Sequence, residues 1–171
     1  MTLLDTPGHV DFSAEMERTL QVMDYAILII NGADGVQGHT RTLWNLLNQY
    51  QIPVFLFVNK MDQAGTDQEK LLLELKGKLS EACVSFVDNQ SQEEWFDNLA
   101  MCSESAMEEY LEHASLKEDT IANLIQSREV YPCYFGSALK LQGVEEFLQG
   151  LQMYTRSAGR GSQFGAKVYK I

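Results

Sequence analysis

The chain has 171 residues, of which 45% are hydrophobic and 10% aromatic, and its formal net charge is −11. These totals are typical of one globular domain with an ordinary hydrophobic core, and no apolar run is long enough to form a transmembrane helix. The three cysteines lack CxxC spacing, and Met1 starts no signal-peptide pattern. We therefore expect a cytoplasmic protein without disulfides, a zinc site or membrane association.

The first third of the chain alternates short apolar runs with segments of helical periodicity. Thr2–Thr6 is a short apolar run that we expect to form a strand. Asp11–Met23 and Gly38–Tyr50 carry apolar residues at helical spacing. Tyr25–Asn31 and Pro53–Asn59 are continuous apolar runs, typical of strands buried on both faces. This alternation predicts a parallel α/β sheet.

The sequence becomes more polar after Asp62. In chain order, we expect glutamate-rich helices over 67–82, 91–113 and 116–128, a strand over Tyr131–Gly136 and a helix over Val144–Tyr154. The helical stretch from 66 to 130 therefore separates two strands of one sheet.

Most of the negative charge lies in that helical stretch. Between Thr66 and Val130 there are 15 acidic and 5 basic residues, a net charge of −10, whereas the rest of the chain has 9 acidic and 8 basic residues. Such a surface repels nucleic acid and attracts a basic protein face. The alternative, which the sequence leaves open, is a solvated helical surface that only maintains solubility.

A carboxylate and a glycine follow the first apolar run, in the order Asp5-Thr6-Pro7-Gly8-His9. Asp5 would lie at the carboxyl edge of a parallel sheet, where α/β proteins bind ligands, and phosphate-loop NTPases use such an aspartate to hold Mg²⁺. Gly8 would allow its backbone amide to approach a terminal phosphate. The pattern is common, and taken alone it is weak evidence that a structural turn usually explains.

The motif Asn59-Lys60-Met61-Asp62 is more specific because it follows a buried strand. A carboxylate such as Asp62 can accept from the ring N–H and the exocyclic amine of guanine, whereas adenine presents an acceptor at the ring position. Asn59 can bridge the base and neighbouring loops, and the stem of Lys60 can lie over the base plane. The alternative is an ordinary polar turn between a strand and a helix.

A third element, Gly136-Ser137-Ala138-Leu139, ends the strand at 131–136. A small residue here would let a backbone N–H reach the guanine carbonyl oxygen. This signal is weak by itself, but all three elements follow apparent strands in a fixed order. Chance agreement within an unrelated α/β domain is therefore improbable.

The runs DTPGHVDF, MDYAILIINGADGVQ, NKMD and GSAL together resemble the GTPase domain of translational GTPases. Within these, the chain is similar to the elongation factor G group, which includes the ribosomal protection proteins for tetracycline resistance. The distance from Asp62 to Gly136 is closer to that of the ribosomal protection proteins, although translocation and tetracycline protection cannot be separated from this sequence. The implied fold is α/β, a phosphate-loop NTPase-like and mostly parallel sheet, N-terminally incomplete, with an acidic helical insertion.

The resemblance implies a role for each motif residue and two cofactors, GTP or GDP and Mg²⁺, in the complete protein. Asp5 would reach Mg²⁺ through water, Gly8 would contact the γ-phosphate, and His9 would be the catalytic residue that orients the attacking water. Asn59, Lys60 and Asp62 would read guanine, assisted by Ser137, Ala138 and Leu139. Thr6 to about Leu20 would form the switch that senses the γ-phosphate.

The resemblance also implies a division of the chain and a partner. Residues 1–65 and 131–155 would form a partial GTP-binding domain, 66–130 a helical insertion subdomain, 156–163 a linker and 164–171 the first strand of a following β-barrel domain. The partner would be the ribosome, including its stalk protein through the acidic insertion, with no sequence-specific binding of nucleic acid.

One motif of these GTPases, the phosphate loop G-x-x-x-x-G-K-[ST], occurs nowhere in the 171 residues. We therefore expect this chain alone to bind GTP weakly and to hydrolyse none, although the parent protein would be a GTP hydrolase. Without the strand that precedes such a loop, the sheet would have exposed edges, and the isolated chain would be marginally stable, dimerise or aggregate. The alternative is a non-enzymatic, truncated or remodelled product that binds a protein partner through its acidic helices.

Overall fold

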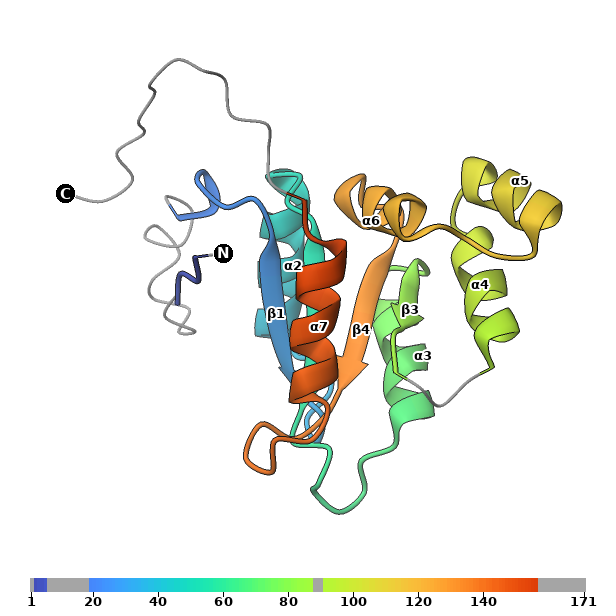
Figure 1. The fold of residues 1–171 in the computed structure, drawn as a ribbon. Helices are drawn as coiled ribbons and strands as arrows, with labels where there is room; N and C mark the ends of the chain where they lie inside the picture. The colour runs from blue at the N-terminus through green and yellow to red at the C-terminus, as the bar shows by residue number, and fades with distance from the viewer. Residues whose placement is uncertain (1, 6–18, 88–90, 157–171) are drawn as a thin grey trace.

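The computed structural model describes residues 2–5, 19–87 and 91–156, and a parallel sheet lies at its centre (Figure 1). The sheet has four strands in the order β1-β2-β4-β3, and every neighbouring pair is parallel. The strands are β1 (Ala26–Asn31), β2 (Val54–Asn59), β3 (Cys83–Ser85) and β4 (Tyr131–Phe135). The helices are α2 (Gly38–Gln49), α3 (Gln68–Lys78), α4 (Gln92–Ala100), α5 (Glu104–His113), α6 (Glu118–Gln126) and α7 (Val144–Tyr154).

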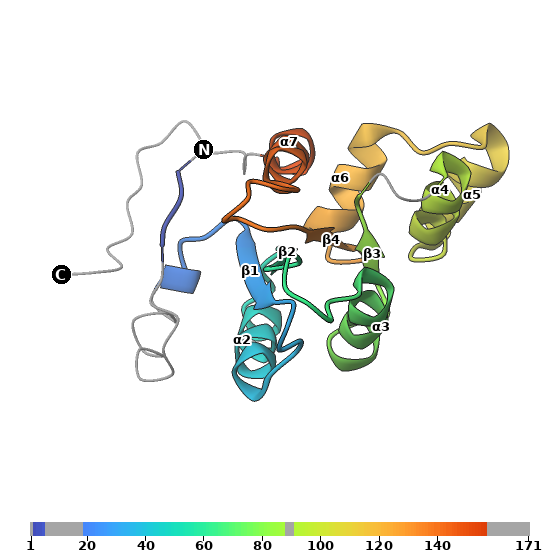
Figure 2. The same cartoon turned by 90° about the horizontal axis from the view of Figure 1, so that it is seen from below.

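Helices cover both faces of the sheet, with α2 and α3 on one face and α6 and α7 on the other (Figure 2). The alternation of side chains along β2 explains this arrangement, because successive residues of a strand point to opposite faces. Val54, Leu56 and Val58 pack in the core with α2 and α3. Phe55 and Phe57 pack in the second core, with α6 and α7. These observations confirm the predicted α/β fold with a parallel sheet.

The strand β1 is less buried than the sequence suggests. Its apolar run predicts burial on both faces, but only alternate residues such as Leu28 and Ile30 are buried, and Ile29 is 64% exposed. The reason is the position of β1 at the end of the described sheet. On that face α7 packs against β2 instead, with the rings of Phe147 and Phe57 centred 5.0 Å apart.

The segment before β1 differs from the expected strand over Thr2–Thr6. Residues 2–5 form no strand, and Leu3 is 67% exposed. Most of the helix expected over Asp11–Met23 lies outside the described residues, as do residues 157–163 of the expected linker and the strand expected over 164–171.

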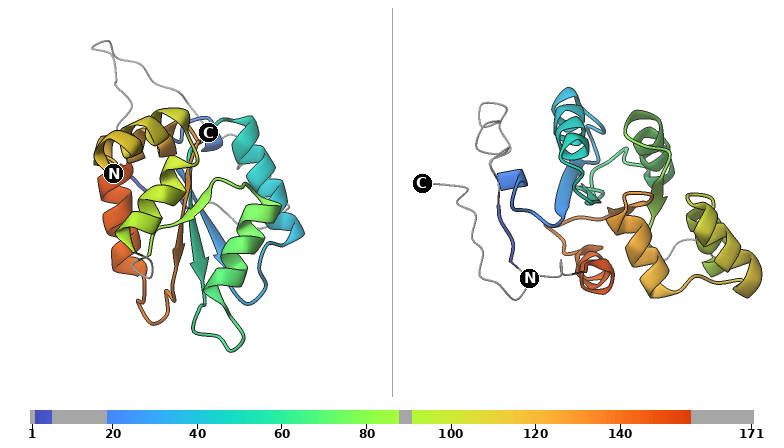
Figure 3. Two further views of the ribbon diagram at one scale, coloured as in Figure 1. Left: turned by 90° about the vertical axis from the view of Figure 1, so that its right-hand side faces the viewer. Right: turned by 90° about the horizontal axis from the view of Figure 1, so that it is seen from above.

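The stretch from 66 to 130 was expected to be helical, but the structure shows that it also contains a strand. The three-residue strand β3 lies within it and pairs with β4, so the central sheet continues through this stretch. The single helix expected over 91–113 is two helices, α4 and α5, separated by residues 101–103. Figure 3 shows α4 and α5 beyond β3, at the opposite end of the sheet from β1.

Candidate functional site

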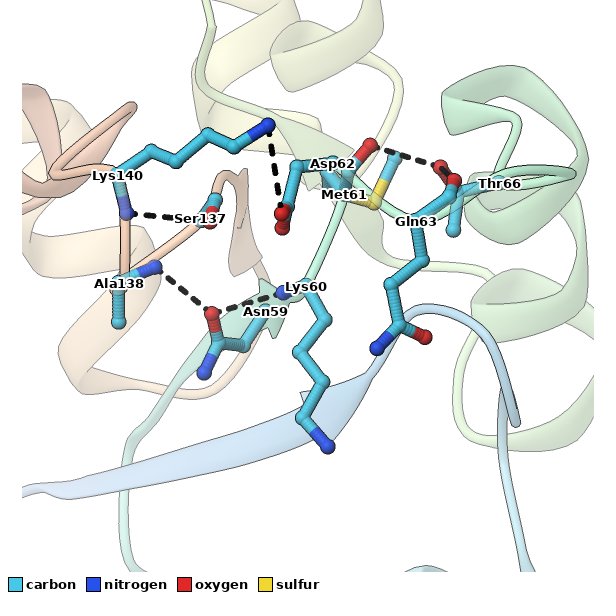
Figure 4. A network of polar contacts seen from close by, with 9 residues as sticks. All are labelled: Asn59, Lys60, Met61, Asp62, Gln63, Thr66, Ser137, Ala138 and Lys140. Atoms are coloured by element: carbon cyan, nitrogen blue, oxygen red, sulfur yellow. Dashed lines mark hydrogen bonds and ion pairs between the residues drawn. The ribbon is translucent and has the colours of Figure 1, made fainter.

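Two predicted motifs meet at the carboxyl edge of the sheet. The loop 59–62 follows β2 and the turn 136–139 follows β4, and these strands are parallel neighbours with Leu56 opposite Cys133 and Val58 opposite Phe135. Because parallel strands end at the same edge of a sheet, the two loops lie side by side (Figure 4). The sequence order and the strand pairing together therefore build one site from segments distant in sequence.

The side chain of Asn59 ties the two loops together. Its Oδ1 atom accepts one hydrogen bond from the backbone amide of Lys60 at 2.8 Å and another from the amide of Ala138 at 2.9 Å. Lys60 has φ = 65°, a left-handed conformation that non-glycine residues rarely adopt. Its side chain extends away from the Asp62 carboxylate (Figure 4).

The backbone between these loops is equally close, and Gly136 is needed for it. The amide of Met61 donates to the carbonyl of Gly136 at 2.9 Å, and the amide of Gly136 donates to the carbonyl of Val58 at 2.9 Å. A Cβ atom on Gly136 would lie 2.1 Å from the carbonyl oxygen of Gln142. Only glycine fits here without a backbone shift.

The Asp62 carboxylate lies between two groups of the turn after β4. Its side chain is 19% exposed, and its Oδ2 atom is 3.5 Å from Nζ of Lys140. A hydrogen bond from the buried Ser137 hydroxyl, with the charge of Lys140, holds the pKa of Asp62 below its ordinary range despite desolvation. The carboxylate is therefore ionised at neutral pH and can accept hydrogen bonds from a ligand.

The loop after Asp62 is fixed by its own side chains. The Thr66 hydroxyl donates to the carbonyls of Met61 at 2.8 Å and of Gln63 at 2.9 Å (Figure 4). Asp67 then caps α3, because its carboxylate accepts from the amide of Lys70 at 3.1 Å. Asp62 is thus held within an ordered connection between β2 and α3.

The loop after β1 also borders the site, although none of the three motifs includes it. The amide of Gly32 donates to the carbonyl of Asn59 at 2.7 Å, and a Cβ atom on Gly32 would lie 2.9 Å from the sulfur of Met61. The run NGADG, which is rich in small residues, was the available sequence signal.

A carboxylate from α3 holds the far end of that loop. Oε1 of Glu74 accepts from the amide of Val36 at 2.9 Å and lies 2.5 Å from Nζ of Lys78. Burial alone would raise the pKa of Glu74, but the hydrogen bonds from Lys78 and Val36 outweigh burial and lower it. The loop after β1 is therefore attached to the helix that follows the 59–62 loop.

Of the residues predicted to face the phosphates and Mg²⁺, the structure describes Asp5 alone, and Asp5 does not lie at this edge. Asp5 is exposed, and residues 2–5 lie beside β1, apart from the loops that follow β2 and β4 (Figure 1). Gly8 and His9 lie outside the described residues. Within the described part of the chain, no group of three or more His, Cys, Asp or Glu residues is placed to hold a metal ion.

Comparison with known proteins decides the family. Residues 1–157 match the family described as the elongation factor Tu GTP binding domain. The chain belongs to this family. This match confirms the resemblance to the GTPase domain of translational GTPases.

The chain is also similar to whole proteins of the family. It is 31% identical to the tetracycline resistance protein TetO of Streptococcus mutans over 188 aligned positions, which cover 100% of this chain and 29% of that protein. The same figures hold for TetO of Streptococcus pneumoniae and of Campylobacter coli. The chain therefore spans 29% of the length of these relatives.

A solved structure shares the fold of this GTP-binding domain. The crystal structure of ttk003000868 from Thermus thermophilus aligns with a TM-score of 0.75 and 20% identity, and the match covers 91% of this chain and 30% of that chain. No helix among residues 2–5, 19–87 and 91–156 is long and apolar enough to cross a membrane.

Proposed function

We propose that the described edge of this GTP-binding domain reads guanine. The observation that carries the proposal is the position of the Asp62 carboxylate beside the turn 136–139, where its Oδ2 atom lies 3.5 Å from Nζ of Lys140. Its two oxygens can accept from the ring N–H and the exocyclic amine of guanine. The turn residues Ser137, Ala138 and Leu139 would contribute backbone amides toward the guanine carbonyl oxygen.

Two exposed stems are available to flank the base. Lys60 extends from the 59–62 loop, and Leu139 is 90% exposed on the turn after β4 (Figure 4 shows Lys60). Apolar stems of this kind can cover the faces of an aromatic base while their ends remain in water. Asn59 would act indirectly, by holding the two loops at a fixed separation.

The activity proposed for the parent protein is that of a ribosome-associated GTPase in the cytoplasm, serving translocation or tetracycline protection. In that setting Asp5, Gly8 and His9 keep the roles that the resemblance implies. This chain contains no G-x-x-x-x-G-K-[ST], so it lacks the backbone cradle and lysine that hold phosphates. We therefore propose base recognition without tight GTP binding or hydrolysis by the chain alone.

Two titrations test this proposal. In ¹⁵N–¹H NMR spectra of the isolated chain, guanosine should shift the amides of the 59–62 loop and the 136–139 turn at millimolar-range concentrations, and adenosine should shift them much less. Equal shifts with both nucleosides would contradict guanine reading. A fluorescent GTP analogue that binds with micromolar affinity or better would contradict the proposed loss of tight binding.

A second function is supported by the acidic helices. Exposed carboxylates cover α4, α5 and the start of α6, namely Glu93, Glu94, Asp97, Glu104, Glu108, Glu112, Glu118 and Asp119. Helices α4 and α5 lie at the end of the fold distant from β1 (Figure 3), whereas Asp119 of α6 is ion-paired with Arg156. The acidic side chains of α4 and α5 favour a basic partner. We propose the ribosomal stalk protein as that partner. Capture of the stalk protein should be lost when Glu104, Glu108 and Glu112 are changed to Lys, and unchanged capture would refute this docking surface.

A further inference from the structure

The turn after β4 places a lysine beside the carboxylate that is proposed to read guanine. Nζ of Lys140 is 3.5 Å from Oδ2 of Asp62, and the Lys140 side chain remains 54% exposed (Figure 4). Among the described residues, Lys140 is the one cation within ion-pair distance of Asp62. None of the motif patterns assigned a role to this residue.

Hydrogen bonds fix the backbone of this turn and therefore the position of the Lys140 backbone. Ser137 and Gln142 exchange two backbone hydrogen bonds of 2.9 and 3.0 Å, and the amide of Lys140 donates to the carbonyl of Ser137 at 3.2 Å. Gly143 closes the turn with φ = 71°, and a Cβ atom there would lie 2.4 Å from the carbonyl oxygen of Phe135. The turn therefore holds the start of the Lys140 side chain close to Ser137.

Base recognition by Asp62 provides a role for Lys140, which is to balance the carboxylate charge when the base is bound. An ionised carboxylate offers about four lone-pair sites, so guanine can use two while Lys140 and Ser137 keep others. Guanine is neutral, and when it covers Asp62 it removes water without supplying a compensating charge. A covered carboxylate that lacks a cation is unfavourable, and Lys140 can remain paired from the solvent side.

We propose that Lys140 is a positioning residue for guanine recognition, because its ammonium stays paired with Asp62 when the base is bound and favours guanine over adenine. Lys140 acts through Asp62 and does not touch the base. This inference rests on the proposed function of Asp62 and names a residue outside the motif that defines it.

The test uses free nucleosides, so that a change of charge does not alter attraction to phosphates. Guanosine and adenosine are titrated into the isolated chain and followed by NMR. The variants are Lys140→Met, which removes the charge, Lys140→Arg, which keeps it, and Lys70→Met as a matched control. Lys70 is an exposed lysine 3.4 Å from the Asp67 carboxylate, in an ion pair outside the 59–62 loop and the 136–139 turn.

The expected result is a loss in guanosine affinity of about two- to fivefold for Lys140→Met, which is the range that one exposed ion pair supports. Adenosine binding should not change, Lys140→Arg should restore guanosine binding, and Lys70→Met should match the wild type. The loss should be largest at pH values where Asp62 is ionised and should disappear when Asp62 is protonated.

The outcomes separate this inference from the proposed function. If the wild type prefers guanosine and Lys140→Met binds it equally well or more tightly, the positioning role is wrong and guanine reading stands. If the wild type shows no preference for guanosine, guanine reading fails and the role of Lys140 fails with it. Lys140→Gln serves as the second neutral variant if the spectrum of Lys140→Met loses dispersion.

Discussion

The side-chain oxygen of Asn59 and the backbone amide of Ala138 are joined by a 2.9 Å hydrogen bond across 79 residues of sequence. The same oxygen accepts from the amide of Lys60, so one side chain satisfies two backbone donors from different loops. The protein's own hydrogen bonds therefore organise both loops. This preorganisation lowers the ordering cost that a ligand would otherwise have to offset.

Replacing Asn59 by Ala should destabilise the fold. Two backbone amides lose their acceptor, and a lost hydrogen bond of this kind costs about 1–3 kcal/mol where the donor stays unsatisfied. Urea unfolding should show the loss in free energy of unfolding, and the amide signals of Lys60 and Ala138 should shift. Asn59→Asp keeps an oxygen acceptor and should retain most of the stability. Equal stability of Asn59→Ala and the wild type would show that these bonds contribute nothing.

Gly136 provides a steric test of the same contact between loops. Gly136→Ala should destabilise the chain by about 1–3 kcal/mol, because the new methyl group meets the Gln142 carbonyl. Gly77 is the matched control, since it lies within α3 and a Cβ atom there has nothing within 4 Å. Gly77→Ala should stabilise the chain by up to about 1 kcal/mol through helix propensity. Thermal unfolding of both variants measures the contrast, and the same sign for both would contradict the steric argument.

The sequence predicted the elements whose signal is local. The runs that became β2 and β4 are long, apolar and followed by recognisable motifs, so both the strands and the placement of Asn59 and Asp62 at one edge could be expected. The strand β3 has three residues between helices, and so short a run carries no periodicity. Its assignment depends on pairing with β4, which is a long-range contact.

Sequence patterns could not predict the partners of individual side chains either, because these partners are also distant in the sequence. The Glu74 carboxylate accepts a hydrogen bond from the Val36 amide, 38 residues away in the sequence. The helical pattern around Glu74 predicts only that it is an exposed acidic residue. Ile29 lies in an apolar run that is typical of a buried strand, but its exposure is set by the position of β1 at the end of the described sheet. In each case the missing information was the arrangement of other elements.

The Glu74 ion pair should make stability depend on pH. The pKa of Glu74 is lowered in the folded chain, so its contribution is fully present above the ordinary glutamate range and is lost as the pH falls through the lowered pKa. Glu74→Ala should cost about 1–3 kcal/mol near neutral pH. Glu74→Gln should cost less than Glu74→Ala, because the glutamine amide oxygen can still accept the hydrogen bond from the Val36 amide. The remaining cost is the loss of the exposed ion pair with Lys78, which contributes up to about 1 kcal/mol.

Urea unfolding of the wild type and Glu74→Gln between acid and neutral pH measures this contribution. The two curves of stability against pH should converge in acid and separate toward neutrality. Glu81→Gln is the control, since Glu81 is an exposed glutamate after α3, and its curve should follow the wild type. A difference between wild type and Glu74→Gln that is independent of pH would rule out an ionised Glu74 as its cause.

The outer edge of β1 should make the isolated chain self-associate. β1 pairs with β2 on one side, and no other described strand pairs with it. A groove of about 820 Å³, lined in part by Leu3, Ala26 and Leu28, runs along this end of the sheet. Unpaired strand edges with exposed apolar side chains favour pairing between chains. Sedimentation velocity should therefore show dimers or larger species whose fraction rises with concentration.

A charge on the exposed face of β1 should weaken this association. Ile29→Lys replaces a side chain that is 64% exposed, and charged side chains on an edge strand oppose pairing with another chain. Leu73→Lys is the matched control, because Leu73 is 69% exposed on α3, away from the β1 edge. We expect Ile29→Lys to shift the distribution toward monomer and Leu73→Lys to leave it unchanged. A wild-type chain that stays monomeric at high concentration would exclude the β1 edge as an association site, and equal effects of both lysines would indicate a general effect of charge.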